Sequence, residues 1–198
     1  MNQEFWNKRY EEFPYSYGTE PNVFFRQQLA GWSAGRIFLP AEGQGRNAVF
    51  AARSGWEVIA CDISEVGKDQ ALSLAGRFGV DIDYRVVEFG ELILAPAYFD
   101  AIGLIYAHFA EDVRRKYHRR LLYSLKPGGR LVMEAFSKDQ LGRSSGGPRS
   151  LDMLYDVAAL EEDFHGMSSL RVEQLETELD ESEFHRGMAS VIRVVGVK

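Results

Sequence analysis

Residues Ala41–Ser64, AEGQGRNAVFAARSGWEVIACDIS, decide the fold class. The stretch has a glycine pair, Gly43 and Gly45, then a helix-forming segment, then an apolar run that ends at Asp62. A glycine turn between a strand and a helix lets a ligand contact backbone, and the helix N-terminus adds free N–H donors. An acidic residue about 20 positions further on, at the end of the next strand, accepts hydrogen bonds from ribose hydroxyls. The stretch therefore indicates a site for a ligand that contains adenosine.

Strands and helices alternate on both sides of this stretch. Apolar runs predict strands at residues 36–40, 57–62, 82–88 and 130–136, with another strand within 99–109. Helices are predicted at residues 46–55, 65–79 and 111–125. This alternation is typical of an α/β fold with a Rossmann-like, doubly wound, mostly parallel sheet.

The alternation stops after Phe136. Residues 137–150 are polar and rich in glycine, which predicts a loop, and a helix is expected over 153–164. Two further strands, within 168–180 and 188–198, are joined by an acidic turn. The sheet is therefore expected to end in an antiparallel C-terminal strand pair.

The segment before the first strand is predicted to be helical. Trp6 and Tyr10 lie four positions apart, as on one face of a short amphipathic helix, and Asn22 is placed to cap a second helix. With no linker or repeat in the sequence, one domain over residues 1–198 is expected. Its N-terminal helical cap segment is 1–35 and its core is 36–198.

Composition and net charge limit the classes of ligand and partner that the protein is expected to bind. The 198 residues are 45% hydrophobic, which suits one compact core, and their net charge of −6 disfavours a nucleic-acid partner. The single cysteine, Cys61, excludes an internal disulfide and a cysteine-rich metal site. No apolar run approaches the ~20 residues of a membrane span, and the N-terminus has no signal-peptide pattern. A cytoplasmic protein that binds no membrane is expected.

The glycine turn by itself leaves three interpretations open. Residues 43–48, GQGRNA, also fit the looser GxGxxA form of a dinucleotide site, and an ordinary strand-to-helix turn is the third possibility. The rest of the chain discriminates between them, because no Tyr-x-x-x-Lys pair of a reductase is visible and the antiparallel ending is wrong for a dehydrogenase.

The whole arrangement resembles the class I S-adenosylmethionine-dependent methyltransferases, over nearly the entire chain. AEGQGRN looks like the first glycine-rich motif of that family, VIACDIS like the second, and VVEFGEL like the segment that meets adenine. YFDAIGLIYAHF and LLYSLKPGGRLVMEAF are similar to the fourth-strand and fifth-strand motifs. The resemblance implies S-adenosyl-L-methionine as cofactor, no metal, and cofactor contacts from Tyr17, Glu42, Gly43, Gly45, Arg46, Asn47, Asp62, Ile63, Ser64, Glu88 and Phe89.

Within the family the chain is similar to small, single-domain enzymes of the tellurite-resistance and thiopurine methyltransferase kind. The shared segments include FWNKRY, YGTEPN and EAFSKDQL. This resemblance implies a small-molecule acceptor with a soft nucleophile, such as a thiol or a selenium or tellurium species, and a monomer or homodimer. Two alternatives are a non-catalytic domain that binds S-adenosylmethionine and an NAD(P)-dependent reductase.

The first motif departs from the family pattern. The usual acidic residue at the end of the first strand is Leu39 here, and the usual first glycine is Ala41. The acidic residue of the turn is Glu42, which either serves the amino group of the methionine moiety or pairs with Arg46 on the surface.

Two side chains are candidates for the chemistry. His108 follows the fourth strand and is either a general base or substrate ligand, or a loop histidine bonded to backbone. Glu134, near the end of the fifth strand, either faces the substrate or is a buried carboxylate paired with an arginine. Residues 142–150 are predicted to be a lid or a disordered connector, and residues 173–183 a solvated acidic face.

Overall fold

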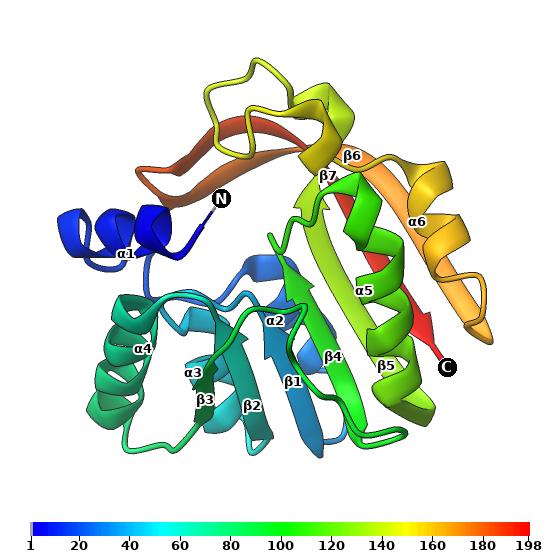
Figure 1. The fold of residues 1–198 in the computed structure, drawn as a ribbon, viewed down its shortest axis with the longest axis horizontal. Helices are drawn as coiled ribbons and strands as arrows, with labels where there is room; N and C mark the ends of the chain where they lie inside the picture. The colour runs from blue at the N-terminus through cyan, green and yellow to red at the C-terminus, as the bar shows by residue number, and fades with distance from the viewer. Residues whose placement is uncertain (1) are drawn as a thin grey trace.

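The computed structural model describes residues 2–198, and its centre is a mixed sheet in the order β3-β2-β1-β4-β5-β7-β6 (Figure 1). β1 pairs parallel with β2 and β4, β2 with β3, and β4 with β5, whereas β7 is antiparallel to both β5 and β6. The strands are β1 Arg36–Pro40, β2 Glu57–Asp62, β3 Asp83–Val86, β4 Phe99–Ile105, β5 Leu125–Phe136, β6 Ser169–Ser182 and β7 His185–Val197. The predicted Rossmann-like sheet with an antiparallel C-terminal pair is confirmed.

Helices cover both faces of the sheet. Helices α2, α3 and α4 pack on one face, and α5 and α6 on the other (Figure 1). Their bounds are α1 Gln3–Glu12, α2 Val23–Leu29, α3 Arg46–Arg53, α4 Glu65–Phe78, α5 Glu111–Ser124 and α6 Val157–Asp163, with short 3₁₀ helices η1 Lys138–Gln140 and η2 Leu151–Met153. No helix within residues 2–198 is long and apolar enough to cross a membrane.

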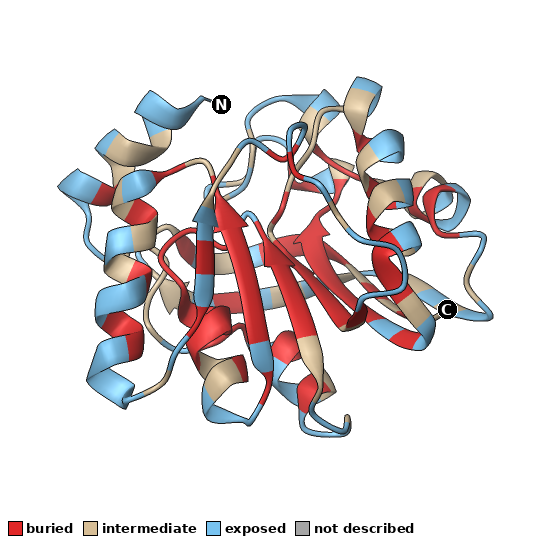
Figure 2. Cartoon of the chain, turned by 60° about the horizontal axis from the view of Figure 1, so that its bottom comes forward, coloured by how far each residue is buried: buried red, intermediate tan, exposed pale blue. Residues whose placement is uncertain are grey.

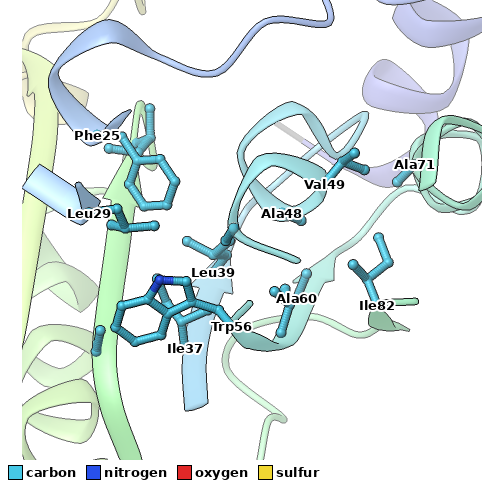
Figure 3. Close-up of a cluster of buried hydrophobic side chains, with 14 of the residues drawn as sticks. Phe25, Leu29, Ile37, Leu39, Ala48, Val49, Trp56, Ala60, Ala71 and Ile82 are labelled. Atoms are coloured by element: carbon cyan, nitrogen blue, oxygen red, sulfur yellow. The ribbon is translucent and has the colours of Figure 1, made fainter. Parts of the chain in front are cut away.

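The strands are buried between these helix layers (Figure 2). On the face of α2 and α3, Ile37 and Leu39 of β1 meet Phe25 and Leu29 of α2 (Figure 3). Burial of one such side chain contributes about 1.5–3 kcal/mol. Because Phe25 is fully buried, the N-terminal segment is packed into the core and fixes the chain that leads to the site.

Local side chains set the helix limits. The Asn22 side chain accepts a hydrogen bond from the Phe25 N–H and begins α2, as expected. The predicted helix over 153–164 is shorter and begins at Val157, because the Asp156 side chain caps it and Tyr155 forms a bridge with Ser137. The β5 strand begins earlier than predicted, at Leu125.

The carboxyl ends of the parallel strands lie at one edge of the sheet. The β6–β7 hairpin arches over this edge toward α1, and the segment 137–155 lies beside it (Figure 1). Ligands of open α/β sheets bind at this edge.

Candidate functional site

The glycine turn after β1 is built by backbone conformations that favour glycine. Gly43 and Gly45 have φ angles of 59° and 86°, and Ala41 takes a left-handed φ of 53° although it carries a Cβ. The Gly43 N–H donates to Asp62 Oδ2 at 3.0 Å, and the Ser64 N–H donates to Asp62 Oδ1 at 2.9 Å. Asp62 therefore joins the turn to the end of β2.

Glu42 is buried at the N-terminus of α3. Its Oε1 accepts hydrogen bonds from the N–H groups of Asn47 at 2.8 Å and Ala48 at 2.7 Å, while its Oε2 has only a 3.4 Å contact to the Asn47 side chain. Burial raises the pKa of Glu42 to about 7, against the lowering effect of these hydrogen bonds. The surface pairing of Glu42 with Arg46 is wrong: Glu42 is buried and Arg46 binds another carboxylate.

Helix α1 covers the glycine turn. Tyr10 is buried, and a Cβ added at Gly43 would lie 2.6 Å from its hydroxyl oxygen. The Trp6 ring stacks on Tyr10 at 5.5 Å, and the Ser64 hydroxyl donates to Asn7 Oδ1 at 2.7 Å. These contacts place the N-terminal helix directly over the ends of β1 and β2.

The loop after β3 places Glu88 and Phe89 beside the same edge. Glu88 is exposed, and the Phe89 ring is buried against Phe109 at 5.0 Å and Tyr117 at 4.6 Å. A ligand at this loop would therefore meet the Glu88 carboxylate and the Phe89 backbone rather than the Phe89 ring.

Glu134 is the centre of a buried polar network beyond β4. Its Oε2 accepts from Arg193 Nε at 2.6 Å, and its Oε1 accepts from the Tyr106 hydroxyl at 3.0 Å and from Asn22 Nδ2 at 2.6 Å. The sequence left two interpretations of Glu134 open, and the structure shows the second, a buried carboxylate paired with an arginine.

Glu181 extends this network from the β6–β7 hairpin. It accepts from Arg46 at 2.9 Å, from Asn22 at 2.9 Å and from His185 Nδ1 at 3.2 Å. Burial opposes ionisation, but the hydrogen bond from His185 and the charge of Arg46 prevail and lower the pKa of Glu181 to about 2. The predicted solvated acidic face is thus wrong at Glu181, whose side chain is 9% exposed.

His185 stands among aromatic rings at the same place. Its ring lies 4.4 Å from Tyr106 and 4.7 Å from Tyr17, and burial lowers its pKa. Because ionised Glu181 accepts at Nδ1, the proton sits on Nδ1 and Nε2 keeps a lone pair, for which residues 2–198 supply no hydrogen-bond partner.

His108 is occupied by backbone groups. Its Nδ1–H donates to the Met153 carbonyl at 2.6 Å, and its Nε2 accepts from the Phe136 N–H at 3.3 Å. Burial lowers the pKa of His108 to about 4. The geometry is that of the loop histidine bonded to backbone, and its role as a base stays a prediction.

Tyr17 and Arg46 lie side by side. The Tyr17 carbonyl accepts from Arg46 at 2.9 Å, and burial raises the pKa of the Tyr17 phenol. Arg46 is 7% exposed, so it does not lie on the surface as a partner of Glu42 would.

The segment 142–150 is fastened to the hairpin. Gln140 donates to Ser145 at 2.9 Å and to the Gly146 carbonyl at 2.9 Å, while Ser145 donates to the Met188 carbonyl at 2.8 Å. These contacts give the segment an ordered position beside His185, although most of its residues are exposed, and its role as a lid stays a prediction.

Asn22, Glu181, His185 and Arg193 are polar residues of this site that sequence reasoning missed. The available signals were the need of Arg46 for a counter-charge and the expected pairing of Glu134 with an arginine, and the sequence locates neither partner. In the described part of the chain, no group of three or more His, Cys, Asp and Glu side chains could hold a metal ion.

These features define a class of protein: an α/β sheet with a glycine turn, a ribose-type aspartate and an antiparallel final strand. The family model described as a methyltransferase domain matches residues 40–129, from the end of β1 into β5. The matched residues include the glycine turn and Asp62, and the match supports an S-adenosylmethionine-dependent methyltransferase with S-adenosylmethionine as its cofactor. A search of curated protein sequences finds no match.

Solved structures share the fold at low identity. TehB from Haemophilus influenzae superimposes with a TM-score of 0.72 at 14% identity, over 99% of this chain and 66% of TehB. A methyltransferase from Aquifex aeolicus has a TM-score of 0.64 at 14% identity, over 100% of this chain and 98% of the other. A protein that converts a disulfide bond into a thioacetal group in echinomycin biosynthesis has a TM-score of 0.74 at 16% identity, over 99% and 92%.

Proposed function

We propose that the enzyme methylates a small molecule through a soft nucleophile: a thiol, or a reduced selenium or tellurium species. One observation carries the proposal: the two carboxylates and His108 on the acceptor side already have partners, and burial lowers the pKa of the remaining histidine, His185. Glu134 is held by Arg193, Glu181 by Arg46, and both ring nitrogens of His108 by backbone. A nucleophile that is largely deprotonated at neutral pH needs no strong base.

The chain's own residues fit the cofactor. Gly43 and Gly45 form the turn with left-handed φ angles, packed beneath Tyr10 and against Ala71, and Asp62 lies at the end of β2, where a ribose would be held. Glu42 Oε2 has acceptor capacity for an ammonium group. When bound, S-adenosylmethionine supplies an electrophilic methyl group on a sulfonium.

The residues beyond β4 would hold the acceptor. Tyr17, Tyr106 and Phe136 give His185 an aromatic surround that suits a polarizable atom. Nε2 of His185 can take the proton of an acidic thiol or selenol. Alignment of acceptor and methyl group then supplies much of the rate.

Methyl transfer to a panel of acceptors tests this function. The panel holds an aromatic thiol, selenite and tellurite with a reductant, a catechol and a primary amine, and the readout is S-adenosylhomocysteine by mass spectrometry. Turnover is expected with the thiol or chalcogen acceptors, and calorimetry should show binding of S-adenosylhomocysteine but not of NADPH. Turnover of the catechol or amine alone, or of none while the cofactor binds, would contradict the proposal.

A further inference from the structure

One side chain ties the loop after β3 to helix α5. The Arg120 guanidinium donates to the carbonyls of Phe89 at 3.2 Å and Gly90 at 3.0 Å, and also to that of Leu92. Guanidinium is planar and carries five N–H donors in a fixed arrangement, so it can bind several carbonyls at once. Lysine cannot reproduce this fork.

Packing against α5 completes the attachment. The Phe89 ring lies against Tyr117, and the Arg120 guanidinium carbon is 5.7 Å from the centre of the Phe89 ring. A Cβ at Gly90 would lie 3.0 Å from the Tyr117 hydroxyl, so the loop approaches the helix closely. Within the loop, Phe89 and Leu92 are buried in the core, whereas Ile93 is 90% exposed, and apolar packing does not fix the direction of the backbone N–H and C=O groups. Arg120 is therefore the main polar anchor of the turn at residues 88–92.

The anchor decides which groups of the loop remain for a ligand. The carbonyls of Phe89, Gly90 and Leu92 are turned to Arg120. The Glu88 carboxylate and the Phe89 N–H have no hydrogen-bond partner anywhere in residues 2–198. An acceptor and a donor side by side match the 6-amino group and the N1 lone pair of adenine.

We infer that Arg120 is a positioning residue that sets the selectivity of the enzyme for adenine in its cofactor. The inference rests on the proposed function and on the placement of adenine at Glu88 and Phe89 that the methyltransferase resemblance implies. Arg120 acts through the loop: it fixes the backbone so that the Glu88 carboxylate and the Phe89 N–H meet the base edge together. Without Arg120 the loop still packs through Phe89, but the two groups lose their fixed relation.

The ratio of affinities for two bases tests the role of Arg120, because a residue that only stabilised the fold would not change this ratio. S-inosylhomocysteine has a 6-oxo group and an N1–H, so it offers an acceptor where Glu88 needs a donor and a donor to the Phe89 N–H. The wild-type enzyme should bind S-adenosylhomocysteine at least about tenfold more tightly than S-inosylhomocysteine, as expected for hydrogen bonds to a charged group. The Arg120→Gln variant should lose most of this ratio while kcat at saturating S-adenosylmethionine changes less than about twofold.

Arg119→Gln is the matched control. Arg119 is the neighbouring residue of the same helix, is exposed, and makes no hydrogen bond to the loop, so the variant removes the same charge. Arg120→Lys keeps the charge and loses the fork, and it serves as a second variant should Arg120→Gln fold poorly. Amide hydrogen exchange at residues 88–92 reports the attachment without any ligand, and it should be faster in both Arg120 variants than in Arg119→Gln.

The outcomes separate the two proposals. A wild-type enzyme that binds both compounds equally would refute the adenine placement itself. A wild-type preference that Arg120→Gln and Arg120→Lys both retain, with unchanged exchange at residues 88–92, would overturn the role of Arg120. A ratio lost in both Arg120 variants and kept in Arg119→Gln is the expected result.

Discussion

The carboxyl edge of the sheet has two halves that are assembled differently. In the cofactor half, formed by the ends of β1, β2 and β3, Gly43 bonds to Asp62 only 19 positions away and Glu42 to Asn47 only 5 away. In the acceptor half, formed beyond β4 by β5 and the β6–β7 hairpin, Asn22 bonds to Glu134 across 112 positions and Arg46 to Glu181 across 135. The first half is a local motif, and the second exists only after the chain has folded.

The electrostatics of the two halves also differ. Glu42 in the cofactor half is buried without a partner cation, and its pKa rises to about 7. Glu181 in the acceptor half is nearly as buried, but His185 and Arg46 lower its pKa to about 2. A glutamate side chain is thus only partly ionised near neutral pH in the cofactor half and fully ionised in the acceptor half.

The largest expected effect comes from breaking the acceptor half. Arg46→Met leaves ionised Glu181 buried without its cation, and we expect a loss of about 3 kcal/mol in the free energy of unfolding, measured by urea titration. Adding Glu181→Gln should recover part of this loss. The control is Arg186→Met, which removes an exposed pair with Asp180 at 3.3 Å and should cost less than about 0.5 kcal/mol. Equal losses in the two arginine variants would show that burial of the pair does not matter.

A glycine of the cofactor half comes next. A Cβ at Gly45 would lie 2.5 Å from the Ala71 Cβ and 2.8 Å from its Cα, at a φ of 86°. Gly45→Ala should therefore cost about 2–3 kcal/mol in thermal or urea unfolding. Gly76→Ala, in the same packed helix α4 as Ala71, meets nothing within 4 Å and should gain about 0.5–1 kcal/mol. A tolerated Gly45→Ala would mean that α3 and α4 are not held at this spacing.

Asp62 tests ligand binding in the cofactor half. Asp62→Asn keeps the shape but removes the charge that accepts ribose hydroxyls, and the affinity for S-adenosylhomocysteine should fall about 10- to 100-fold in calorimetry. Asp69→Asn, an exposed position in α4, should leave the affinity unchanged. An unchanged affinity in Asp62→Asn would remove this aspartate from the cofactor site.

The smallest effect is a pH dependence that sharpens the contrast between Glu42 and Glu181. The pKa of Glu42 is raised from 4.5 to about 7, so Glu42 is protonated below pH 7 and must lose its proton to pair with the ligand ammonium. The affinity for S-adenosylhomocysteine should therefore rise by up to about tenfold from pH 6 to pH 8 and stay flat in Glu42→Gln. Glu65→Gln, at an exposed position, should keep the wild-type profile. A flat wild-type profile would rule out contact between Glu42 and the ammonium.

Much of the fold follows from local pattern. Asn22 caps α2 as expected, and α4 is bounded by a Ser64 cap and by Gly79 in a left-handed conformation. The helix expected at 153–164 was too long, because Asp156 caps it locally and Tyr155 forms a bridge with Ser137, which only the tertiary structure brings together. The apolar periodicity of the sequence continues through Tyr155 and Asp156 and therefore gives no sign of the bridge or the cap.

The sequence by itself determined the sheet, the glycine turn and the position of Asp62, because their residues are near neighbours whose spacing follows from strand and helix geometry. Only the tertiary structure decided which residues form the acceptor half of the site. Glu181 belongs to an acidic run that the sequence predicts to be solvated, but it is buried because the β6–β7 hairpin arches back onto Arg46. Both ring nitrogens of His108 bond to backbone groups, whereas Nε2 of His185 keeps a lone pair. These contacts depend on how far the β6–β7 hairpin bends and on which polar groups are buried away from water. The spacing of residues in the sequence determines neither.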